Sequence, residues 1–406
     1  MASIDDYEPF VGKSTIEELK MLAIELKGKL IQNINATAVG GGVAEILNSL
    51  VPLLNELGVN ARWDVIKGGE DFFQVTKKIH NALQNRPAEL SKRDFEVFLE
   101  YNRMNAEQMS LDGDIVFVHD PQPVALAERK KIYKNRWIWR CHIDTSSPNP
   151  KAWNFLKKYL RQYDAAVFSA PYFAQKLPIR RFLISPSIDP LSNKNVDLPR
   201  QTIHQVLAKY GIKRRKPIIA QISRFDWLKD PIGVIDVYRL VKKDIDCQLI
   251  LAGGEAADDP EAVRVLEEVK EEAGNDPDIF VLPLSFPGDI DVNALQRAAS
   301  VVIQKSVREG FGLTVSEAMW KGKPIVASAT GGIPFQIIHR FSGLLTRTTE
   351  GTAYAVKKLL YNPEYARRLG KNAREYARQN LLITRHIKEY LLLFLSLGHR
   401  KDIVRF

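Results

Sequence analysis

Cysteine is scarce in this chain of 406 residues. The two cysteines, Cys141 and Cys247, lie far apart and form no Cys-x-x-Cys pair. The sequence also has no His-Glu-x-x-His pair and no cluster of histidines and cysteines with the spacing of metal ligands. It therefore predicts neither a disulfide framework nor a structural metal site, and the reducing conditions of the cytoplasm suit it.

Long hydrophobic runs are also missing. The most apolar late stretch, residues 390–397, is far shorter than the ~20 residues that a membrane-spanning helix needs. The N-terminal segment MASIDDYEPFVGKS is acidic and polar, unlike a secretory signal peptide. We expect a soluble cytoplasmic protein that does not associate with membranes.

Basic residues outnumber acidic ones, but they form no long cluster in the sequence. Lysine and arginine total 58 against 48 aspartates and glutamates, which gives a net charge of +10. The densest basic runs, residues 213–216 and 180–181, are short, and no arginine-rich tail accompanies them. Nucleic-acid binding also predicts clustered base-stacking aromatic residues, which are not visible, so it is the less favoured interpretation. A solvated surface is the simplest reading of the charge, and a small phosphorylated ligand is compatible with it.

Two arrays of alternating strands and helices fill most of the chain. Short apolar strands rich in β-branched residues alternate with helical patterns, which is typical of a mostly parallel sheet. We predict an α/β protein with two Rossmann-like, doubly wound domains, residues 1–190 and 200–383, joined by the Pro- and Asn-rich segment 186–199. Ligands of such sheets bind outside the carboxyl ends of the strands, so the cleft between the facing domains is the expected site. Strands are expected at residues 29–34, 61–66, 114–118, 137–142, 165–169 and 182–185, and again at 217–222, 247–252, 279–282, 301–304 and 324–327.

A glycine-rich turn, Gly40 to Gly42, follows the first expected strand and precedes a helix. It does not match the Gly-x-Gly-x-x-Gly fingerprint, because Glu45 stands at the last position. Glycines let the backbone approach a ligand, and a helix N-terminus offers free N–H groups to an anion. A tight turn without a ligand explains the same residues equally well.

Two cations follow the first strand of the second array, in Ser-Arg-Phe-Asp-Trp-Leu-Lys-Asp. Arg224 and Lys229 would lie at the carboxyl end of that strand, where two positive charges suit a diphosphate. A solvated loop with incidental charge is the alternative.

The most informative segment is Arg-Glu-Gly-Phe-Gly-Leu-Thr-Val-Ser-Glu-Ala, residues 308–318. Its glycines, Gly310 and Gly312, permit close backbone approach, and a helix begins near Leu313 with its N-terminus available to phosphate. Glu309 in the loop suits the hydroxyls of a sugar, and Glu317 in the helix suits a ribose diol. The alternative is an ordinary strand-to-helix junction with a capping acid.

Together these motifs resemble the retaining glycosyltransferases of the GT-B fold, in the large family that includes sucrose and sucrose-phosphate synthases. Residues 309–317 resemble the family's Glu-x7-Glu motif, residues 223–230 its Arg…Lys diphosphate clamp, and Gly331-Gly332-Ile333-Pro334 its Gly-Gly-x-Pro segment. The match covers nearly the whole chain in the family's order. Phe335 departs from it, because many relatives have an acidic residue there.

The resemblance implies roles for the residues of the second domain. Arg224 and Lys229 would hold the diphosphate, Glu309 would bind the hydroxyls of the donor sugar, and Glu317 would bind the ribose. The backbone N–H groups of Gly310, Phe311, Gly312 and Leu313 would line the sugar and the phosphates.

In the first domain the resemblance places the glycine turn with Gly41 and Gly42 near the diphosphate and the acceptor. His119 and His142 match histidines that the family places near the transferred sugar, and both count among the implied catalytic residues with Glu309, Arg224 and Lys229. His119, Asp120 and Asp144 would contact the acceptor. A histidine at a strand end is more often structural, and that alternative stays open. A C-terminal helix, about residues 384–406, would pack back onto this domain.

A narrower likeness, to the archaeal trehalose glycosyltransferring synthases, rests on Ile34–Leu47 (INATAVGGGVAEIL), Val118–Pro123 (VHDPQP) and Trp139–Ser146 (WRCHIDTS). It implies retaining transfer of glucose from UDP-, ADP- or GDP-glucose to glucose, which yields trehalose. A trehalose phosphorylase, or a related transferase with another acceptor, is the alternative. No tightly bound cofactor is expected; a divalent metal such as Mg²⁺ is compatible but not required, and a homodimer is left open.

Overall fold

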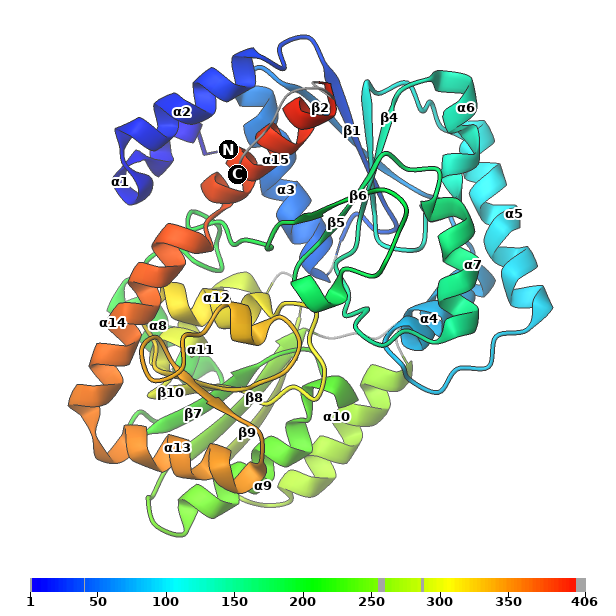
Figure 1. The fold of residues 1–406 in the computed structure, drawn as a ribbon. Helices are drawn as coiled ribbons and strands as arrows, with labels where there is room; N and C mark the ends of the chain where they lie inside the picture. The colour runs from blue at the N-terminus through cyan, green and yellow to red at the C-terminus, as the bar shows by residue number, and fades with distance from the viewer. Residues whose placement is uncertain (1, 40, 255–259, 286–287, 399–406) are drawn as a thin grey trace. The chain divides into compact units, whose positions relative to one another are not determined.

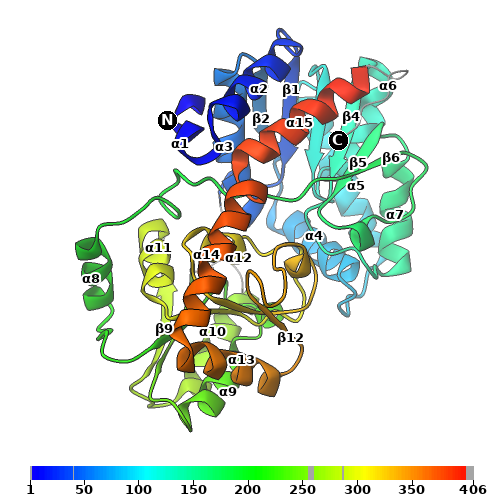
Figure 2. The ribbon, with the colours of Figure 1, turned by 60° about the vertical axis from the view of Figure 1, so that its left-hand side comes forward.

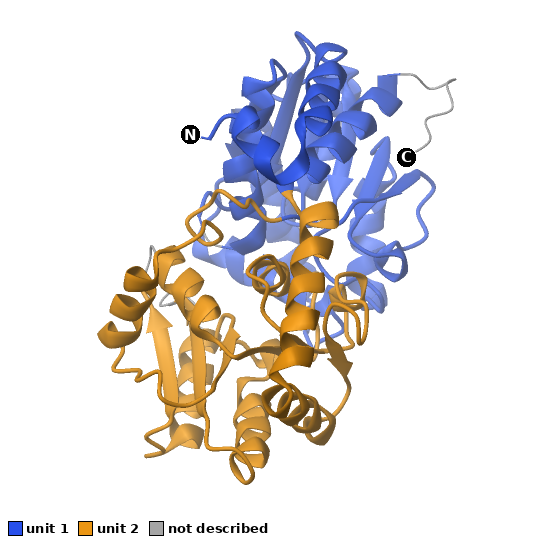
Figure 3. Cartoon of the chain, turned by 90° about the vertical axis from the view of Figure 1, so that its left-hand side faces the viewer, with its two compact units in different colours: residues 1–187, 383–406 blue, residues 188–382 orange. Residues whose placement is uncertain are grey.

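The computed structural model describes residues 2–39, 41–254, 260–285 and 288–398 (Figure 1). The chain forms two compact units. Unit 1 consists of residues 1–187 and 383–406, and unit 2 of residues 188–382 (Figure 3). In the described part of the chain, no helix combines the length and the apolar character needed to cross a membrane.

Unit 1 is built on a parallel sheet of six strands in the order β2-β1-β3-β4-β5-β6. β1 is the first strand of the sheet in the sequence; β2 is added on one side of it, and β3 to β6 follow on the other side. The strand order therefore reverses between β1 and β3, and sheets of this kind bind ligands at such a point. The strands are β1 (Leu30–Asn35), β2 (Asn60–Val65), β3 (Ile115–His119), β4 (Arg136–Arg140), β5 (Ala165–Phe168) and β6 (Arg180–Leu183).

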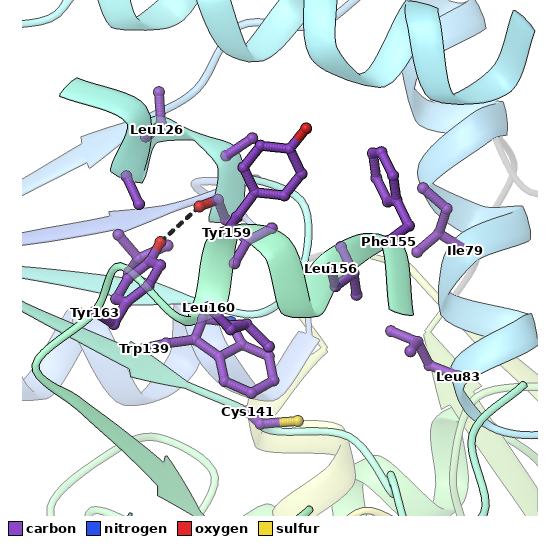
Figure 4. Close-up of a cluster of buried hydrophobic side chains, with 14 of the residues drawn as sticks. Ile79, Leu83, Leu126, Trp139, Cys141, Phe155, Leu156, Tyr159, Leu160 and Tyr163 are labelled. Carbon is purple, nitrogen blue, oxygen red and sulfur yellow. Dashed lines mark hydrogen bonds between the residues drawn. The ribbon is translucent and has the colours of Figure 1, made fainter. Parts of the chain in front are cut away.

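Helices cover both faces of this sheet. One face packs against α4, α5 and α7 through a large apolar core, in which Trp139 and Cys141 of the β4 region lie beside Leu156 and Leu160 of α7 (Figure 4). The other face is covered by α15, which also packs against α2 and α3 (Figure 2). The main helices of unit 1 are α1 (Glu8–Val11), α2 (Lys13–Ile24), α3 (Gly41–Glu56), α4 (Glu70–Leu83), α5 (Lys92–Gln108), α6 (Lys130–Tyr133), α7 (Pro150–Leu160) and α15 (Ile383–Gly398).

Unit 2 repeats the plan with the strand order β12-β11-β10-β7-β8-β9. The order reverses between β7 and β10, so the segments that follow these two strands meet at the switch point. The strands are β7 (Ile218–Ile222), β8 (Gln248–Gly254), β9 (Ile279–Leu284), β10 (Val301–Gln304), β11 (Ile325–Ser328) and β12 (Leu344–Thr346). The helices are α8 (Arg200–Lys209), α9 (Pro231–Lys242), α10 (Pro260–Ala273), α11 (Asp289–Ala298), α12 (Leu313–Trp320), α13 (Thr349–Tyr361) and α14 (Pro363–Asn380).

Three expectations change in detail. The segment 186–199 is not a free linker, because from residue 188 it packs on unit 2, where Asn293 Nδ2 donates to the Val196 carbonyl at 2.8 Å. The strand expected at 137–142 ends at Arg140, which leaves His142 in the following loop. Of the helix expected at about 384–406, α15 accounts for the residues up to 398, and residues 399–406 lie outside the described residues.

Candidate functional site

A buried ion pair marks the switch point of unit 2. After β7 the chain forms a short 3-10 turn, Trp227–Lys229, which begins where Leu228 N donates to Asp226 Oδ1 at 2.8 Å. Lys229 Nζ then lies 2.5 Å from Glu309 Oε2, and the two side chains are only 16% and 8% exposed. Ser306 Oγ donates to the same carboxylate oxygen at 3.0 Å. Two residues predicted to bind the donor are thus brought together.

The loop that carries Glu309 rests on the Gly331-Gly332 segment. Gly331 has a φ of +54°, and a Cβ atom there would lie 1.7 Å from the Glu309 carbonyl oxygen. A Cβ at Gly332 would lie 2.5 Å from the Gly310 oxygen, and Gly332 N donates to the Glu309 carbonyl at 3.1 Å. The two glycines are required because the backbones touch, so their part in the site is to fix the Glu309 loop.

Gln336 fixes the rest of that loop, although no sequence signal singled it out. Its side chain is fully buried. Its Nε2 donates to the carbonyls of Phe311 and Gly312, and its Oε1 accepts from Ser316 Oγ at 2.6 Å. It follows Phe335, where the family pattern has its acidic residue. An amide that can donate and accept at once suits a position between a loop carbonyl and a helix hydroxyl.

The glycine loop opens directly into α12. Gly312 is the N-cap with a φ of +88°, and the helix starts at Leu313. Val315 N donates to the Gly312 carbonyl at 2.9 Å. The N–H groups at the very start of a helix have no carbonyl partner in the preceding turn, so those before Val315 can serve an acceptor. Glu317 lies in the second turn and is 2% exposed; its Oε2 accepts from Gln296 Nε2 at 3.1 Å.

Arg224 differs from the other predicted donor residues. Its side chain is 62% exposed and pairs with Asp226 at 3.2 Å. The structure therefore leaves it at the same edge of the sheet as Lys229 but outside the buried ion pair. Because the side chain is mostly exposed, its guanidinium can reach a ligand that arrives from solvent.

A polar hollow adjoins the ion pair at the carboxyl ends of β10, β11 and β12. It has a volume of about 260 Å³. Ser306, which hydrogen-bonds Glu309, is one of its walls, and Lys305, paired with Asp230, is another. Thr330 and Arg347 contribute a further hydroxyl and a cation.

In unit 1 the two predicted histidines are also brought together. His119 ends β3 and is 2% exposed. Its Nδ1 lies 3.0 Å from His142 Nε2, and its Nε2 lies 3.2 Å from Asn33 Oδ1 of β1. The pair therefore stands at the switch point of this sheet, between β1 and β3.

Burial keeps both imidazoles neutral. It lowers the pKa of His119 to about 3, with the charge of Arg140 acting in the same direction. Burial also lowers the pKa of His142 well below its usual range, again helped by Arg140. At neutral pH they are hydrogen-bonding groups without charge.

The two predicted aspartates have structural partners. Asp120 adopts a left-handed conformation, with a φ of +64°, and its Oδ1 accepts from His142 N at 2.8 Å. Burial raises the pKa of Asp120 to about 6. Asp144 is 5% exposed and its Oδ1 accepts from Ser146 N at 2.9 Å, which closes a local turn. Asp120 thus positions His142, and Asp144 shapes the loop behind it.

The glycine turn ends in two exposed residues. Gly41, with a φ of +76°, and Gly42 are the first residues of α3, whose N-terminus follows β1. Gly40 lies outside the described residues. In the part of the chain that the structure describes, no group of three or more histidines, cysteines and carboxylates is arranged to hold a metal ion.

Comparison with known proteins extends this picture. Residues 33–175 match the family model described as "Trehalose synthase, N-terminal domain", and residues 203–376 match "Glycosyl transferases group 1". The chain is 45% identical to a trehalose synthase of Pyrococcus horikoshii over 97% of its own length and 96% of that protein's. It is 31% identical to a trehalose phosphorylase of Grifola frondosa, over 93% of this chain and 58% of that protein.

A solved structure supports the fold. The α,α-trehalose-phosphate synthase (UDP-forming) of Burkholderia xenovorans superposes with a TM-score of 0.73 at 15% identity, over 90% of this chain and 99% of that one. At this identity the likeness concerns the fold alone. Together with the two six-stranded parallel sheets, it confirms the predicted GT-B architecture of two Rossmann-like units.

Proposed function

Because this chain belongs to the trehalose synthase family of glycosyltransferases, we propose that it transfers glucose, with retention, from a nucleoside-diphosphate glucose to free glucose and so forms trehalose. The matches confirm the family resemblance that the motifs predicted. The observation that carries the proposal is the Lys229–Glu309 pair on a glycine-supported loop at the switch point of unit 2. It joins a cation for phosphate to a carboxylate for sugar hydroxyls.

The donor would bind to unit 2. The diphosphate would draw Lys229 away from Glu309 and engage the exposed Arg224, since both cations lie on the segment that follows β7. Glu309, released from Lys229, would accept hydrogen bonds from the hydroxyls of the glucose. The N–H groups of residues 310–313 would line the sugar and the phosphates, and Glu317 would hold the ribose.

The reaction needs charge stabilisation and orientation more than a nucleophilic side chain. The bond between the sugar C1 and the diphosphate oxygen breaks, and a bond from C1 to the acceptor oxygen forms on the same face. The acceptor proton passes to the departing diphosphate. Arg224, Lys229 and the start of α12 would stabilise the negative charge that develops on that leaving group.

Unit 1 would supply uncharged contacts to the sugars. The neutral His119 and His142, positioned by Asn33 and Asp120, suit hydroxyl groups. A phosphorylated acceptor would need a fork of accessible cations. Arg140, two residues before His142 in the sequence, is fully buried and offers no such fork at the surface. We therefore favour free glucose over glucose 6-phosphate as the acceptor.

The resemblance to a trehalose phosphorylase gives a second candidate. Such an enzyme would cleave trehalose with inorganic phosphate and would need no nucleotide. The near-complete coverage of the synthase at higher identity favours the synthase over the phosphorylase.

The two candidates separate in one experiment. The protein is incubated with glucose and each of UDP-, ADP- and GDP-glucose, and in parallel with trehalose and phosphate. We expect glucose-dependent release of nucleoside diphosphate, and a slower rate when glucose 6-phosphate replaces glucose. Phosphate-dependent release of glucose 1-phosphate, without any nucleotide reaction, would replace the proposed function by the phosphorylase.

A further inference from the structure

A fully buried arginine lies inside unit 1 and forms no ion pair with any of the described residues. Arg140, the last residue of β4, has no exposed surface. Its Nη2 makes one long hydrogen bond, 3.4 Å to Ser169 Oγ, while its Nε and Nη1 have no partner among the described residues. A buried cation without an anion is strongly unfavourable in a protein interior. The guanidinium therefore needs a hydrogen-bond acceptor that the described part of the chain does not provide.

Asp120 does not fill that role. Its carboxylate feels the charge of Arg140, but it forms no ion pair with it in the described part of the chain. Oδ1 of Asp120 is instead engaged by His142 N at 2.8 Å. Burial also raises the pKa of Asp120 to about 6, so this carboxyl is a weakened source of negative charge below neutral pH.

The side chain of Arg140 lies on the face of the sheet that α15 covers. Arg140 pairs in register with His119 of β3, and residues two apart in a strand share a face, so both lie on the same face as Phe117. The Phe117 ring packs against Tyr390 of α15 at a centroid distance of 5.0 Å. Trp139, one residue before Arg140, points to the opposite face and into the core around α7 (Figure 4). Arg140 is thus enclosed between the sheet and α15.

Two buried side chains of α15, His386 and Tyr390, each have a polar atom without a hydrogen-bond partner among the described residues. His386 and Tyr390 are fully buried, and their rings lie 4.3 Å apart. Burial lowers the pKa of His386 and raises the pKa of Tyr390, and both groups lie within the electrostatic reach of Arg140. In the part of the chain that is described, His386 Nε2 and Tyr390 Oη have no hydrogen-bond partner. His386 Nδ1 lies 2.8 Å from Ser187 Oγ. With that hydroxyl as donor, Nε2 carries the proton, so both orphaned groups of α15 can donate.

We propose that Arg140, His386 and Tyr390 form an internal anion site that takes a small monovalent anion of the chloride class. The orphaned groups can all donate hydrogen bonds and one carries a fixed positive charge, which is the chemistry that recognises an anion. Because all three side chains are fully buried, the site excludes bulky polyatomic anions. The bound anion would neutralise the charge on the strand that leads to His142. This inference does not depend on the proposed reaction.

Thermal unfolding tests the site. The melting temperature of the full chain is measured as sodium chloride replaces sodium gluconate at constant ionic strength, since gluconate is too large to enter. Binding to the folded state alone raises the melting temperature, and the rise saturates as the site fills. Identical melting in the two salts would overturn the proposal.

Three variants assign the effect. Arg140→Met is expected to abolish the chloride dependence. Tyr390→Phe keeps the ring but removes one donor, and is expected to raise the half-saturating chloride concentration about three- to ten-fold. Tyr163→Phe is the matched control, because Tyr163 is equally buried but its hydroxyl already donates to the Val124 carbonyl at 2.9 Å; it should keep the wild-type dependence. An unchanged chloride dependence in Tyr390→Phe, or one retained in Arg140→Met, would contradict the assignment.

Crystals grown in bromide provide direct evidence. An anomalous peak within hydrogen-bonding reach of Arg140, His386 and Tyr390 would support the site. The absence of a peak there, with water or no density between these groups, would overturn it.

Discussion

At the scale of single residues, the candidate site of unit 2 depends on a pairing that a ligand must break. Lys229 and Glu309 neutralise each other while both are largely buried, so removing one leaves the other as an uncompensated charge. The same pairing keeps the loop in place before a ligand arrives. Each residue is therefore expected to influence both binding and the order of the loop.

Glu309→Gln keeps the size of the side chain but removes its charge. If the carboxylate binds the donor sugar in the transition state, kcat/KM falls by about 10- to 100-fold, the equivalent of a lost charged hydrogen bond of about 1.5–3 kcal/mol. Steady-state kinetics measures the effect. The control is Glu375→Gln, because Glu375 forms an exposed ion pair with Arg378 on α14 and should tolerate the change. Equal kinetics for the two variants would remove Glu309 from the site.

Arg224 gives a prediction about the ligand. Its side chain is exposed and close to Lys229 in sequence, so we expect it to contact the diphosphate and not the nucleoside. Calorimetry of Arg224→Gln should show a larger loss of affinity for UDP than for uridine. A loss of equal size for both ligands would mean that Arg224 does not touch phosphate.

At the scale of elements, the site is a set of loops held by close backbone contacts. Gly331→Ala would force a Cβ atom against the Glu309 carbonyl, 1.7 Å away, in a backbone conformation that L-residues disfavour. We expect lower thermal stability and a large loss of turnover, because the Glu309 loop must shift.

Gly211→Ala separates these two effects. Gly211 also has a positive φ, +70°, but a Cβ there would meet nothing within 4 Å. It should therefore cost about 1–2 kcal/mol of stability, as backbone strain does, and leave turnover intact. If Gly331→Ala lost no more activity than Gly211→Ala, the steric support of the loop would be refuted.

The elements also show what the sequence could and could not reveal. Apolar, β-branched strands stand out, and so does the glycine loop between β10 and α12, because both patterns are local. The sequence pattern did not predict α5, because its many polar residues conceal a narrow apolar face. Its capping box, formed by Ser91 and Asp94, is a sequence signal that marks the start of this helix. No sequence pattern indicates the role of Gln336, because its side chain joins two segments that meet only in the folded chain. The pairing of His119 with His142 likewise follows from the adjacency of β3 and β4, not from sequence spacing.

At the scale of the whole molecule, buried histidines link stability to pH. His119, His142 and His386 have pKa values lowered by burial, to about 3 in the case of His119. The unfolded chain binds protons at these histidines below about pH 6.5, while the folded chain does not. The contribution of these histidines to stability is therefore present above pH 6.5 and is lost on acidification, by about 1.4 kcal/mol per pH unit for each histidine. Asp120, with its pKa raised to about 6, acts in the opposite sense between its unfolded and folded pKa values, and one carboxyl offsets one histidine at most.

Denaturant unfolding between pH 5 and 8 tests this expectation. We predict a decline of the unfolding free energy below pH 6.5, and a shallower decline for His119→Asn, which removes one of the three groups. His204→Asn, at an exposed position of α8 outside these clusters, is the control. A slope that His119→Asn leaves unchanged would contradict the role of this buried imidazole.

The central claim concerns the product, and one measurement tests it most directly. The protein is incubated with UDP-, ADP- or GDP-glucose labelled with ¹³C at C1, together with unlabelled glucose, and the disaccharide is identified by NMR. The account predicts a non-reducing disaccharide in which the labelled carbon and the unlabelled anomeric carbon are both α, which is α,α-trehalose. A β configuration at the labelled carbon, a reducing disaccharide, or product formed only with glucose 6-phosphate would contradict the account.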